Sequence, residues 1–206
     1  MDFLSISAHK FNGPKGVGAL YVRIPNRLKP FLTGGGQEKE GRSGTENVPG
    51  IVGMTVALEE AVASLSANMD YLKGLEKHLI DEVLKISDVE LTGDPDNRLP
   101  GFCSFVVADI NHSVLLVNAL NEAGFSVSSG SACSASSKEA SHVLLALGYE
   151  KNLSRMSLRV TLGMDNTMED VDRFVTALNL AISKIRAEQV TRAPRLEGRV
   201  KEVKES

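Results

Sequence analysis

The sequence SISAHKFNGPKG at residues 5–16 is the stretch from which the rest of the chain is interpreted. Residues 3–8 alternate apolar and small polar side chains, a pattern that predicts a β-strand. Lys10 follows this strand closely, and the Asn-Gly-Pro sequence at residues 12–14 predicts a turn after it. Desolvation at a buried strand end would make the Lys10 amine a nucleophile suited to Schiff-base chemistry. A surface lysine at a strand end is the simpler alternative, and this stretch alone leaves both open.

Outward from this stretch, the apolar periodicity predicts a mixed α/β fold. Further strands are expected at residues 17–22, 101–108, 125–128 and 157–162. Helices are expected at residues 51–85, 113–123 and 138–147, and from a capping box of Thr167 with Asp170 to about Arg186. Glycines at six positions interrupt residues 33–50, which predicts an ordered loop.

These elements divide near residue 63 into two parts, followed by a tail. Residues 1–63 contain two strands and a glycine-rich loop but little apolar surface, so we expect them to form one edge of a larger domain. Residues 64–188 alternate helices and strands and are expected to form a small α/β domain. Residues 189–206 mix Arg, Lys and Glu with one proline, which predicts a solvated tail.

The bulk composition argues against several classes of protein. The 206 residues are 42% hydrophobic and 24% charged, as in soluble globular proteins. A net charge of −3 gives no electrostatic basis for nucleic-acid binding. No apolar run approaches the roughly 20 residues of a membrane helix, and residues 1–5 lack the features of a signal peptide. Two cysteines make no disulfide framework, so we expect a reducing, cytoplasmic setting.

The glycine-rich loop at residues 34–47 is a candidate anion site. Closely spaced glycines let backbone N–H groups approach a phosphate, Ser43 and Thr45 add hydroxyl groups, and Arg42 adds positive charge. The stretch matches neither a Walker A loop nor a dinucleotide-binding fingerprint. A surface loop without a ligand is equally compatible with these residues.

The two cysteines have opposite surroundings. Cys133 lies within SSGSACSASS at residues 128–137, where small polar neighbours predict an accessible loop. The helix expected after it would favour the thiolate, so Cys133 is a candidate nucleophile, and an incidental exposed cysteine is the alternative. Cys103 lies between Phe102 and Phe105 in a predicted strand and is expected to be structural.

Arg159 and the histidines are the other polar residues that call for an interpretation. Arg159 lies within the apolar strand predicted at residues 157–162, where an unpaired charge is costly to bury. Its guanidinium could bind a substrate carboxylate, or form a structural salt bridge on an edge strand. The four histidines show no metal-ligand spacing, so no metal site is expected. We expect His78 on a helix surface or in helix packing, His142 to be structural, and His112 to be a turn or cap residue.

Three motifs point jointly to one family. They are SISAHKFNGPKG at residues 5–16, RSGTEN at residues 42–47, and SGSACS at residues 129–134 with SHVL at 141–144 and SLRV at 157–160. In order and spacing they resemble the cysteine desulfurases, pyridoxal-phosphate enzymes of the class V aminotransferase family, from about residue 2 to residue 186. The resemblance implies the C-terminal half of a fold type I aminotransferase, that is, an edge of the large cofactor domain and then the small domain.

The same resemblance assigns the cofactor residues. It implies that Lys10 carries pyridoxal phosphate as a Schiff base and that Ser7 and His9 hold the cofactor phosphate. It also implies that Thr45 reaches the phosphate bound by a neighbouring subunit, and hence a homodimer.

On the substrate side, the resemblance implies that Arg159 grips the carboxylate of L-cysteine. The Cys133 thiolate would then attack the substrate sulfur, giving L-alanine and a persulfide on Cys133. The persulfide would pass to an acceptor, such as an iron–sulfur scaffold or a thiolation protein.

Two departures accompany the resemblance. Ala140 replaces a proline that the family usually has. Roughly the first half of the usual enzyme is absent, and by resemblance that half supplies the aromatic residue stacked on the cofactor ring and the aspartate paired with its pyridine nitrogen. We therefore expect the chain to need a complementing N-terminal half. The alternatives are an inactive fragment that binds sulfur-transfer partners, and a related selenocysteine or cysteine-sulfinate lyase.

Overall fold

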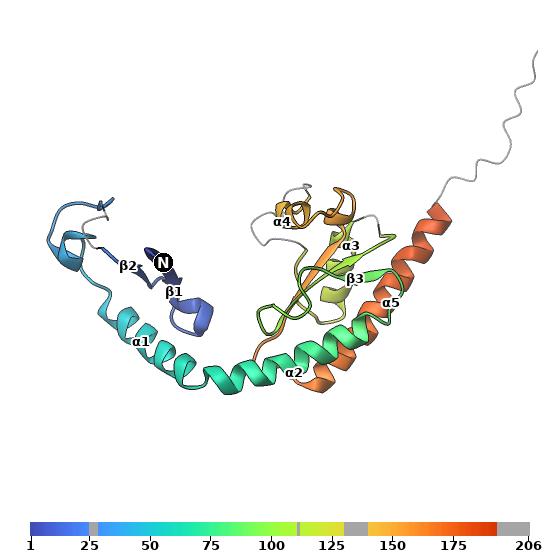
Figure 1. The fold of residues 1–206 in the computed structure, drawn as a ribbon, viewed down its shortest axis with the longest axis horizontal. Helices are drawn as coiled ribbons and strands as arrows, with labels where there is room; N and C mark the ends of the chain where they lie inside the picture. The colour runs from blue at the N-terminus through green and yellow to red at the C-terminus, as the bar shows by residue number, and fades with distance from the viewer. Residues whose placement is uncertain (25–28, 111, 130–139, 193–206) are drawn as a thin grey trace, which may run out of the picture. The chain divides into compact units, whose positions relative to one another are not determined.

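A computed structural model describes residues 1–24, 29–110, 112–129 and 140–192 (Figure 1). The chain divides into two compact units, Met1–Asn68 and Met69–Ser206. Each unit contains one small antiparallel sheet and at least one helix, so the predicted mixed α/β fold is confirmed. The assignment of residues 1–63 and 64–188 to two domains of a larger enzyme stays a prediction.

The first unit is built on a two-stranded antiparallel sheet. β1 (Phe3–Ser7) pairs with β2 (Gly18–Val22), so the two strands predicted in this region are confirmed. Between them the chain forms the 3-10 helix η1 (Ala8–Phe11) and a turn, in which the Gly13 N–H donates to the Ala8 carbonyl at 2.9 Å. The polypeptide therefore reverses direction directly after Lys10.

Helix α1 (Val48–Ala63) packs against this turn. Asn47 caps the helix by accepting a hydrogen bond from the Gly50 N–H at 3.2 Å. Gly53 allows the close approach, because a Cβ at that position would lie 2.7 Å from Pro14 Cγ. The helix thus supports the turn that follows η1 in the same unit.

The single helix predicted at residues 51–85 is wrong, since a break at Ser64 separates α1 from α2 (Leu65–Val83). The Ser64 hydroxyl donates to the Glu60 carbonyl at 2.8 Å and accepts from the Asn68 side-chain amide at 2.9 Å. A serine hydroxyl that binds the preceding turn competes with the backbone ladder. Because the apolar spacing continues through the break, periodicity does not reveal it.

The second unit contains a three-stranded antiparallel sheet in the order β3-β4-β5. Its strands are β3 (Val89–Leu91), β4 (Phe102–Val107) and β5 (Ser157–Thr161). β4 and β5 confirm two predicted strands. β3 was not predicted, because three residues are too few for an alternation to be recognised.

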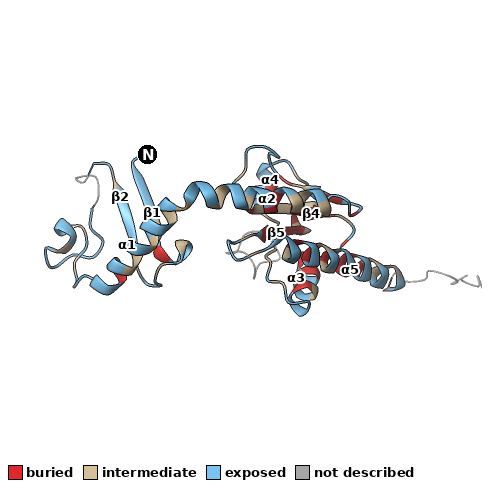
Figure 2. Ribbon diagram, turned by 90° about the horizontal axis from the view of Figure 1, so that it is seen from below, coloured by how far each residue is buried: buried red, intermediate tan, exposed pale blue. Residues whose placement is uncertain are grey.

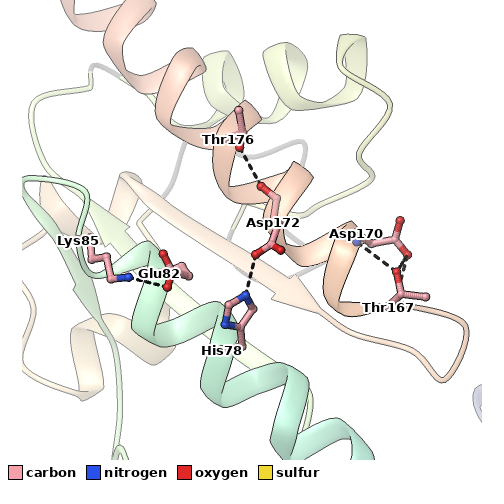
Figure 3. Close-up of polar contacts among 7 residues, drawn as sticks. All are labelled: His78, Glu82, Lys85, Thr167, Asp170, Asp172 and Thr176. Carbon is pink, nitrogen blue, oxygen red and sulfur yellow. Dashed lines mark hydrogen bonds and ion pairs between the residues drawn. The ribbon is translucent and has the colours of Figure 1, made fainter.

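In the described residues, four helices and one short 3-10 turn accompany this sheet (Figure 1). They are α2, α3 (Ser113–Glu122), α4 (His142–Ala146), η5 (Leu153–Arg155) and α5 (Met168–Arg192). α2 and α5 lie side by side, and His78 Nε2 on α2 is 2.6 Å from Asp172 Oδ1 on α5 (Figure 3). Among the described helices, none alone is long and apolar enough to cross a membrane, and α1 and α2 meet that criterion only when taken together, by length and composition.

The core of the second unit lies between one face of the sheet and three helices. Its fully buried members come from β4, β5, α2, α3 and α5, and they include Phe105, Val107, Leu158, Leu75, Leu79, Leu116, Leu120, Leu178 and Ile182. Figure 2 shows these buried positions gathered in the second unit, whereas the first unit is mostly exposed. Among the described residues of the first unit, only Ala8 and Gly50 are buried.

Two other predicted elements need correction. The strand expected at residues 125–128 is wrong, because in the described chain only Ser128 pairs, as an isolated bridge to Arg159. The helix expected at residues 138–147 is shorter, and residues 138 and 139 lie outside the described part. α4 begins at His142, after Ser141 has capped it by accepting from the Leu144 N–H at 3.5 Å.

The capping box at the start of α5 is confirmed (Figure 3). The Asp170 N–H donates to Thr167 Oγ1 at 3.2 Å, and the Thr167 N–H donates to Asp170 Oδ2 at 3.0 Å. The hydrogen bonds from Thr167 lower the pKa of the Asp170 carboxyl. α5 continues to Arg192, so the first residues of the tail predicted at 189–206 are helical. The rest of that tail lies outside the described residues.

Candidate functional site

The predicted cofactor residues Ser7, His9 and Lys10 surround a buried alanine. Ala8 is 0% exposed, and its N–H donates to the Val17 carbonyl at 3.1 Å. Its three polar neighbours are exposed. In the described part of the chain, no hydrogen bond or ion pair engages the Ser7 hydroxyl, the His9 imidazole or the Lys10 amine. The buried alanine therefore fixes a backbone from which three unengaged polar side chains depart.

These side chains fit two parts of pyridoxal phosphate. Hydroxyl and imidazole groups donate hydrogen bonds to phosphate oxygens, and a primary amine condenses with an aldehyde. Lys10 is exposed, however, so the first unit alone does not supply the desolvation that the sequence hypothesis required. In the same described residues, no group of three or more His, Cys, Asp or Glu could hold a metal ion.

Hydrogen bonds within the glycine-rich loop show which of its three polar side chains is available to bind an anion. The Ser43 hydroxyl donates to the Leu32 carbonyl at 2.8 Å, and Arg42 Nη1 donates to the Ser43 carbonyl at 2.6 Å. Both side chains are thus engaged within the loop. Thr45 is exposed, and no described residue binds its hydroxyl. Of the three polar candidates in this loop, Thr45 is the one available to a ligand.

The same loop contains strained backbone, which its sequence did not indicate. In η3 (Gln37–Glu40), Glu38, Lys39 and Glu40 have φ values of 50°, 54° and 64°, in the left-handed region that residues other than glycine rarely adopt. The Gln37 side chain closes the loop by accepting from the Gly44 N–H at 3.2 Å. The loop predicted at residues 33–50 is confirmed in part, because it contains η3 and its last three residues belong to α1, and its backbone carries a conformational cost.

Arg159 lies in β5 with its backbone held on both sides. On the neighbouring strand β4, the residue paired with Arg159 is Ser104. On the other side the Arg159 N–H donates to the Ser128 carbonyl at 2.7 Å, and its carbonyl accepts from the Ser128 N–H at 3.1 Å. Arg159 as a residue is half-buried, and its guanidinium carbon lies 6.0 Å from the centre of the Phe102 ring. No described carboxylate forms an ion pair with Arg159, so the structural salt bridge considered as an alternative is not formed within the described residues. The guanidinium is therefore available to bind the carboxylate of a ligand.

Of the two cysteines, Cys103 belongs to the described residues. Cys133 lies outside the described residues, so its predicted role as a nucleophile stays a prediction. Cys103 is 0% exposed in β4, and burial, together with the nearby Glu76 carboxylate, raises the pKa of its thiol to about 12. The expectation that Cys103 is structural is confirmed, because a thiol with that pKa stays protonated at neutral pH.

Three histidines outside the first unit lie on or next to helices. His78 packs between helices through Asp172, as expected. His112 occupies the N-cap position of α3, without a capping hydrogen bond from its side chain. His142 is the first residue of α4 and is exposed, which gives no support to the expected structural role.

The candidate residues therefore fall into two groups on different units. Ser7, His9 and Lys10 share one strand–helix junction in the first unit, which also contains Thr45, whereas Arg159 belongs to the sheet of the second unit. The neighbourhood of Phe102 and Arg159 was not predicted from the sequence. That contact depends on the register of β4 against β5, which the sequence spacing does not specify.

Comparisons with known proteins agree with the motifs. The aminotransferase class-V family model matches residues 1–174. The cysteine desulfurase IscS of Dictyoglomus turgidum is 46% identical over 187 residues, which is 90% of this chain and 47% of that protein. The cysteine desulfurase IscS of Methanosarcina thermophila is 44% identical over 186 residues, covering 90% and 46%. The chain thus spans about half the length of the curated relatives it matches.

Solved structures give the same result. A NifS-like protein superposes with a TM-score of 0.78 at 35% identity, covering 89% of this chain and 46% of the other. A NifS-like protein from Rickettsia africae superposes with a TM-score of 0.79 at 30% identity, covering 89% and 48%. The fold is therefore that of part of a pyridoxal-phosphate-dependent aminotransferase, as predicted.

Proposed function

The chain belongs to the class-V aminotransferases, and from that premise we propose that it is the lysine-bearing half of a cysteine desulfurase. The observation that carries the proposal is identity of 46% and 44% to two cysteine desulfurases along 90% of the chain. The complete enzyme would convert L-cysteine to L-alanine and leave the sulfur as a persulfide. Class-V aminotransferases and cysteine desulfurases depend on pyridoxal phosphate, so the same cofactor is proposed here.

In this proposal the junction after β1 binds the cofactor. The exposed amine of Lys10 provides the covalent attachment, and the unengaged Ser7 hydroxyl and His9 imidazole donate to the phosphate. Pyridoxal phosphate, when bound, supplies an electron sink for the substrate α-carbon. The Lys10 amine, once free, takes and returns a proton at that carbon as a general base.

Thr45 is the proposed phosphate contact from a second copy of the chain. Its hydroxyl is the unengaged one in the glycine-rich loop, while Ser43 is committed to a carbonyl. A homodimer in which this loop reaches the neighbouring cofactor would give the Thr45 hydroxyl a ligand, and backbone strain of the kind found in this loop often occurs at ligand-binding sites.

The sulfur chemistry is assigned to Arg159 and Cys133. Arg159 orients the substrate carboxylate with a guanidinium that no described carboxylate neutralises. The Cys133 thiolate attacks the substrate sulfur, a sulfur–sulfur bond forms, and the carbon–sulfur bond of cysteine breaks. The electron pair of the broken bond stays with carbon, which is protonated to give L-alanine, so no external oxidant is needed.

The first unit also requires a partner. It exposes apolar side chains on both strands and along α1, including Leu20 at 49%, Tyr21 at 52% and Val52 at 57%. A surface of that kind is normally covered. Since the chain spans about half of its relatives, we propose that the unmatched half, in the same or a separate polypeptide, covers this surface. A cytoplasmic location and delivery of sulfur to an acceptor protein such as an iron–sulfur scaffold complete the proposal.

The proposed function can be tested with an enzyme in which the unmatched half is supplied. The part of the Dictyoglomus turgidum relative that this chain does not match is joined to residues 1–206, and L-alanine and thiol-released sulfide are measured with L-cysteine. We expect both products, and we expect Lys10→Ala and Cys133→Ser each to abolish sulfide release. We also expect the isolated chain to bind pyridoxal phosphate poorly.

Three outcomes would oppose the proposal. A folded, cofactor-bound chimaera without alanine formation favours an inactive partner-binding fragment. Activity only with selenocysteine or cysteine sulfinate favours a related lyase. Undiminished sulfide release by Cys133→Ser would remove Cys133 from the mechanism.

A further inference from the structure

Phe102 and Arg159 project from the same face of the second sheet. In the β4–β5 register Ser104 faces Arg159 and Phe102 faces Thr161. Side chains two positions apart on a strand point to one face, so Phe102 is the diagonal neighbour of Arg159. The guanidinium carbon lies 6.0 Å from the ring centre, at the outer limit of a cation–π contact.

This face is opposite the core. On β4, Cys103 and Phe105 point to the other side and are fully buried, and Leu158 does the same on β5. Phe102 and Arg159 are only half-buried. The Arg159 residue is therefore partly covered and partly accessible, so a charged ligand can reach it from solvent.

The backbone of Arg159 has little freedom to move. It is paired with Ser104 on one side and hydrogen-bonded twice to Ser128 on the other. The remaining freedom belongs to a long side chain with several rotatable bonds, whose ordering costs free energy when a ligand binds. In the described residues no carboxylate holds the Arg159 side chain in one conformation, and the aromatic ring that lies over its guanidinium is that of Phe102.

We propose that Phe102 is a positioning residue for Arg159, holding the guanidinium in the orientation that receives the substrate carboxylate. The proposal rests on the proposed function, in which Arg159 binds L-cysteine. Attraction to the ring face uses the charge of the guanidinium and leaves its N–H groups free for a carboxylate, whereas a salt bridge would occupy them. Phe102 touches neither substrate nor cofactor in this role.

The first experiment uses the full chain and needs no activity. Nuclear magnetic resonance of residues 1–206 locates the Arg159 side-chain protons, assigned by their loss in Arg159→Lys. A ring above the guanidinium displaces these signals upfield. Phe102→Leu should abolish the displacement and Phe102→Tyr should retain it. Unchanged Arg159 signals in a folded Phe102→Leu variant would overturn the contact.

The second experiment uses the complemented enzyme. Phe102→Leu should raise KM for L-cysteine about threefold with kcat nearly unchanged, as expected for loss of one partly exposed cation–π contact. Phe102→Tyr, which keeps the aromatic face, should restore the wild-type KM. The matched control is Arg173→Gln, because Arg173 lies at the same 6.0 Å from the Phe125 ring but takes no part in the proposed site.

The possible outcomes distinguish the positioning role of Phe102 from the proposed desulfurase function on which it rests. An active wild-type chimaera whose Phe102→Leu variant keeps the wild-type KM overturns the positioning role and leaves the desulfurase function standing. An equal rise in KM for Arg173→Gln also overturns it, since the effect would then be general. An inactive wild-type chimaera opposes the function, while the resonance experiment still decides whether Phe102 orders Arg159.

Discussion

Both units of this chain contain regular secondary structure, but their interiors are very different. In the second unit, three helices cover one face of a sheet, and residues such as Leu79, Phe105 and Leu178 are fully buried. In the first unit the strands and α1 are well formed, yet only Ala8 and Gly50 are buried among the described residues. Regular local structure thus does not imply a core, and most of the stability of a helix or sheet comes from packing.

The difference in burial between the two units bears on the residues assigned to the site. The lysine that we assign to the cofactor stands on the unit without a core, whereas the arginine assigned to the substrate stands on a self-supporting sheet. A reactive group needs rigid support to keep its geometry. Lys10 must therefore obtain that support from protein that covers the first unit, while Arg159 already has it from β4 and Ser128.

Replacing a phenylalanine by alanine should destabilise the second unit far more than the first. Phe105→Ala removes a fully buried ring from the second unit and should lower the free energy of unfolding by about 3–5 kcal/mol. Phe31→Ala removes a ring that is 97% exposed in the first unit and should change it by less than about 0.5 kcal/mol. Urea denaturation of residues 1–206, followed by circular dichroism, measures both.

A complementing half would change this contrast. If it covers the surface around Phe31, the effect of Phe31→Ala should grow in the complex while that of Phe105→Ala stays the same. A substantial loss of stability from Phe31→Ala in the isolated chain would contradict the description of the first unit as lacking a core.

A second, smaller effect is a pH dependence confined to the second unit. The pKa of the Cys103 thiol is raised from 9.0 to about 12 by burial and by the Glu76 carboxylate. The unfolded chain then loses this proton at a lower pH than the folded chain. The stability contribution is therefore complete below about pH 9 and declines as the pH rises toward 12, by at most about 1.4 kcal/mol per pH unit.

Comparison with Cys103→Ala isolates this dependence from other groups that titrate at high pH. The difference in unfolding free energy between wild type and variant should be constant from pH 7 to about pH 8.5 and should narrow above it. A constant difference up to pH 10.5 would show that the buried thiol ionises as readily in the folded chain as in the unfolded one.

Sequence periodicity predicted most of the fold where a pattern is local and long. It found β1, β2, β4 and β5, and the Thr167 capping box gave the start of α5. It failed where one side chain or a tertiary contact decides. The Ser64 hydroxyl ends α1 within a continuous apolar stripe, and the segment before Ser128 forms one bridge rather than a strand.

The candidate site was nominated from the sequence, and the roles of its residues stay predictions. Motif order nominated Ser7, His9 and Lys10, and within the described residues no hydrogen bond or ion pair engages their side chains. Composition could not separate Thr45 from Ser43, because only the folded loop commits the Ser43 hydroxyl to a carbonyl. A cross-strand neighbour such as Phe102 depends on register, which a single sequence specifies weakly.

The capping residues of two helices, one in each unit, should differ in their effect on stability. Thr167 caps α5, which packs on the core of the second unit, and Asn47 caps the exposed α1 in the first. Removing a side-chain cap typically costs about 1 kcal/mol of helix stability. Thr167→Ala should therefore lower the global unfolding free energy by about that amount, because α5 unfolds together with the core. Asn47→Ala should leave the global value unchanged and instead speed amide hydrogen exchange in the first turns of α1, because a helix outside the core opens locally. Equal global losses from the two substitutions would mean that α1 unfolds with the second unit, and the first unit would then need no covering partner to be stable.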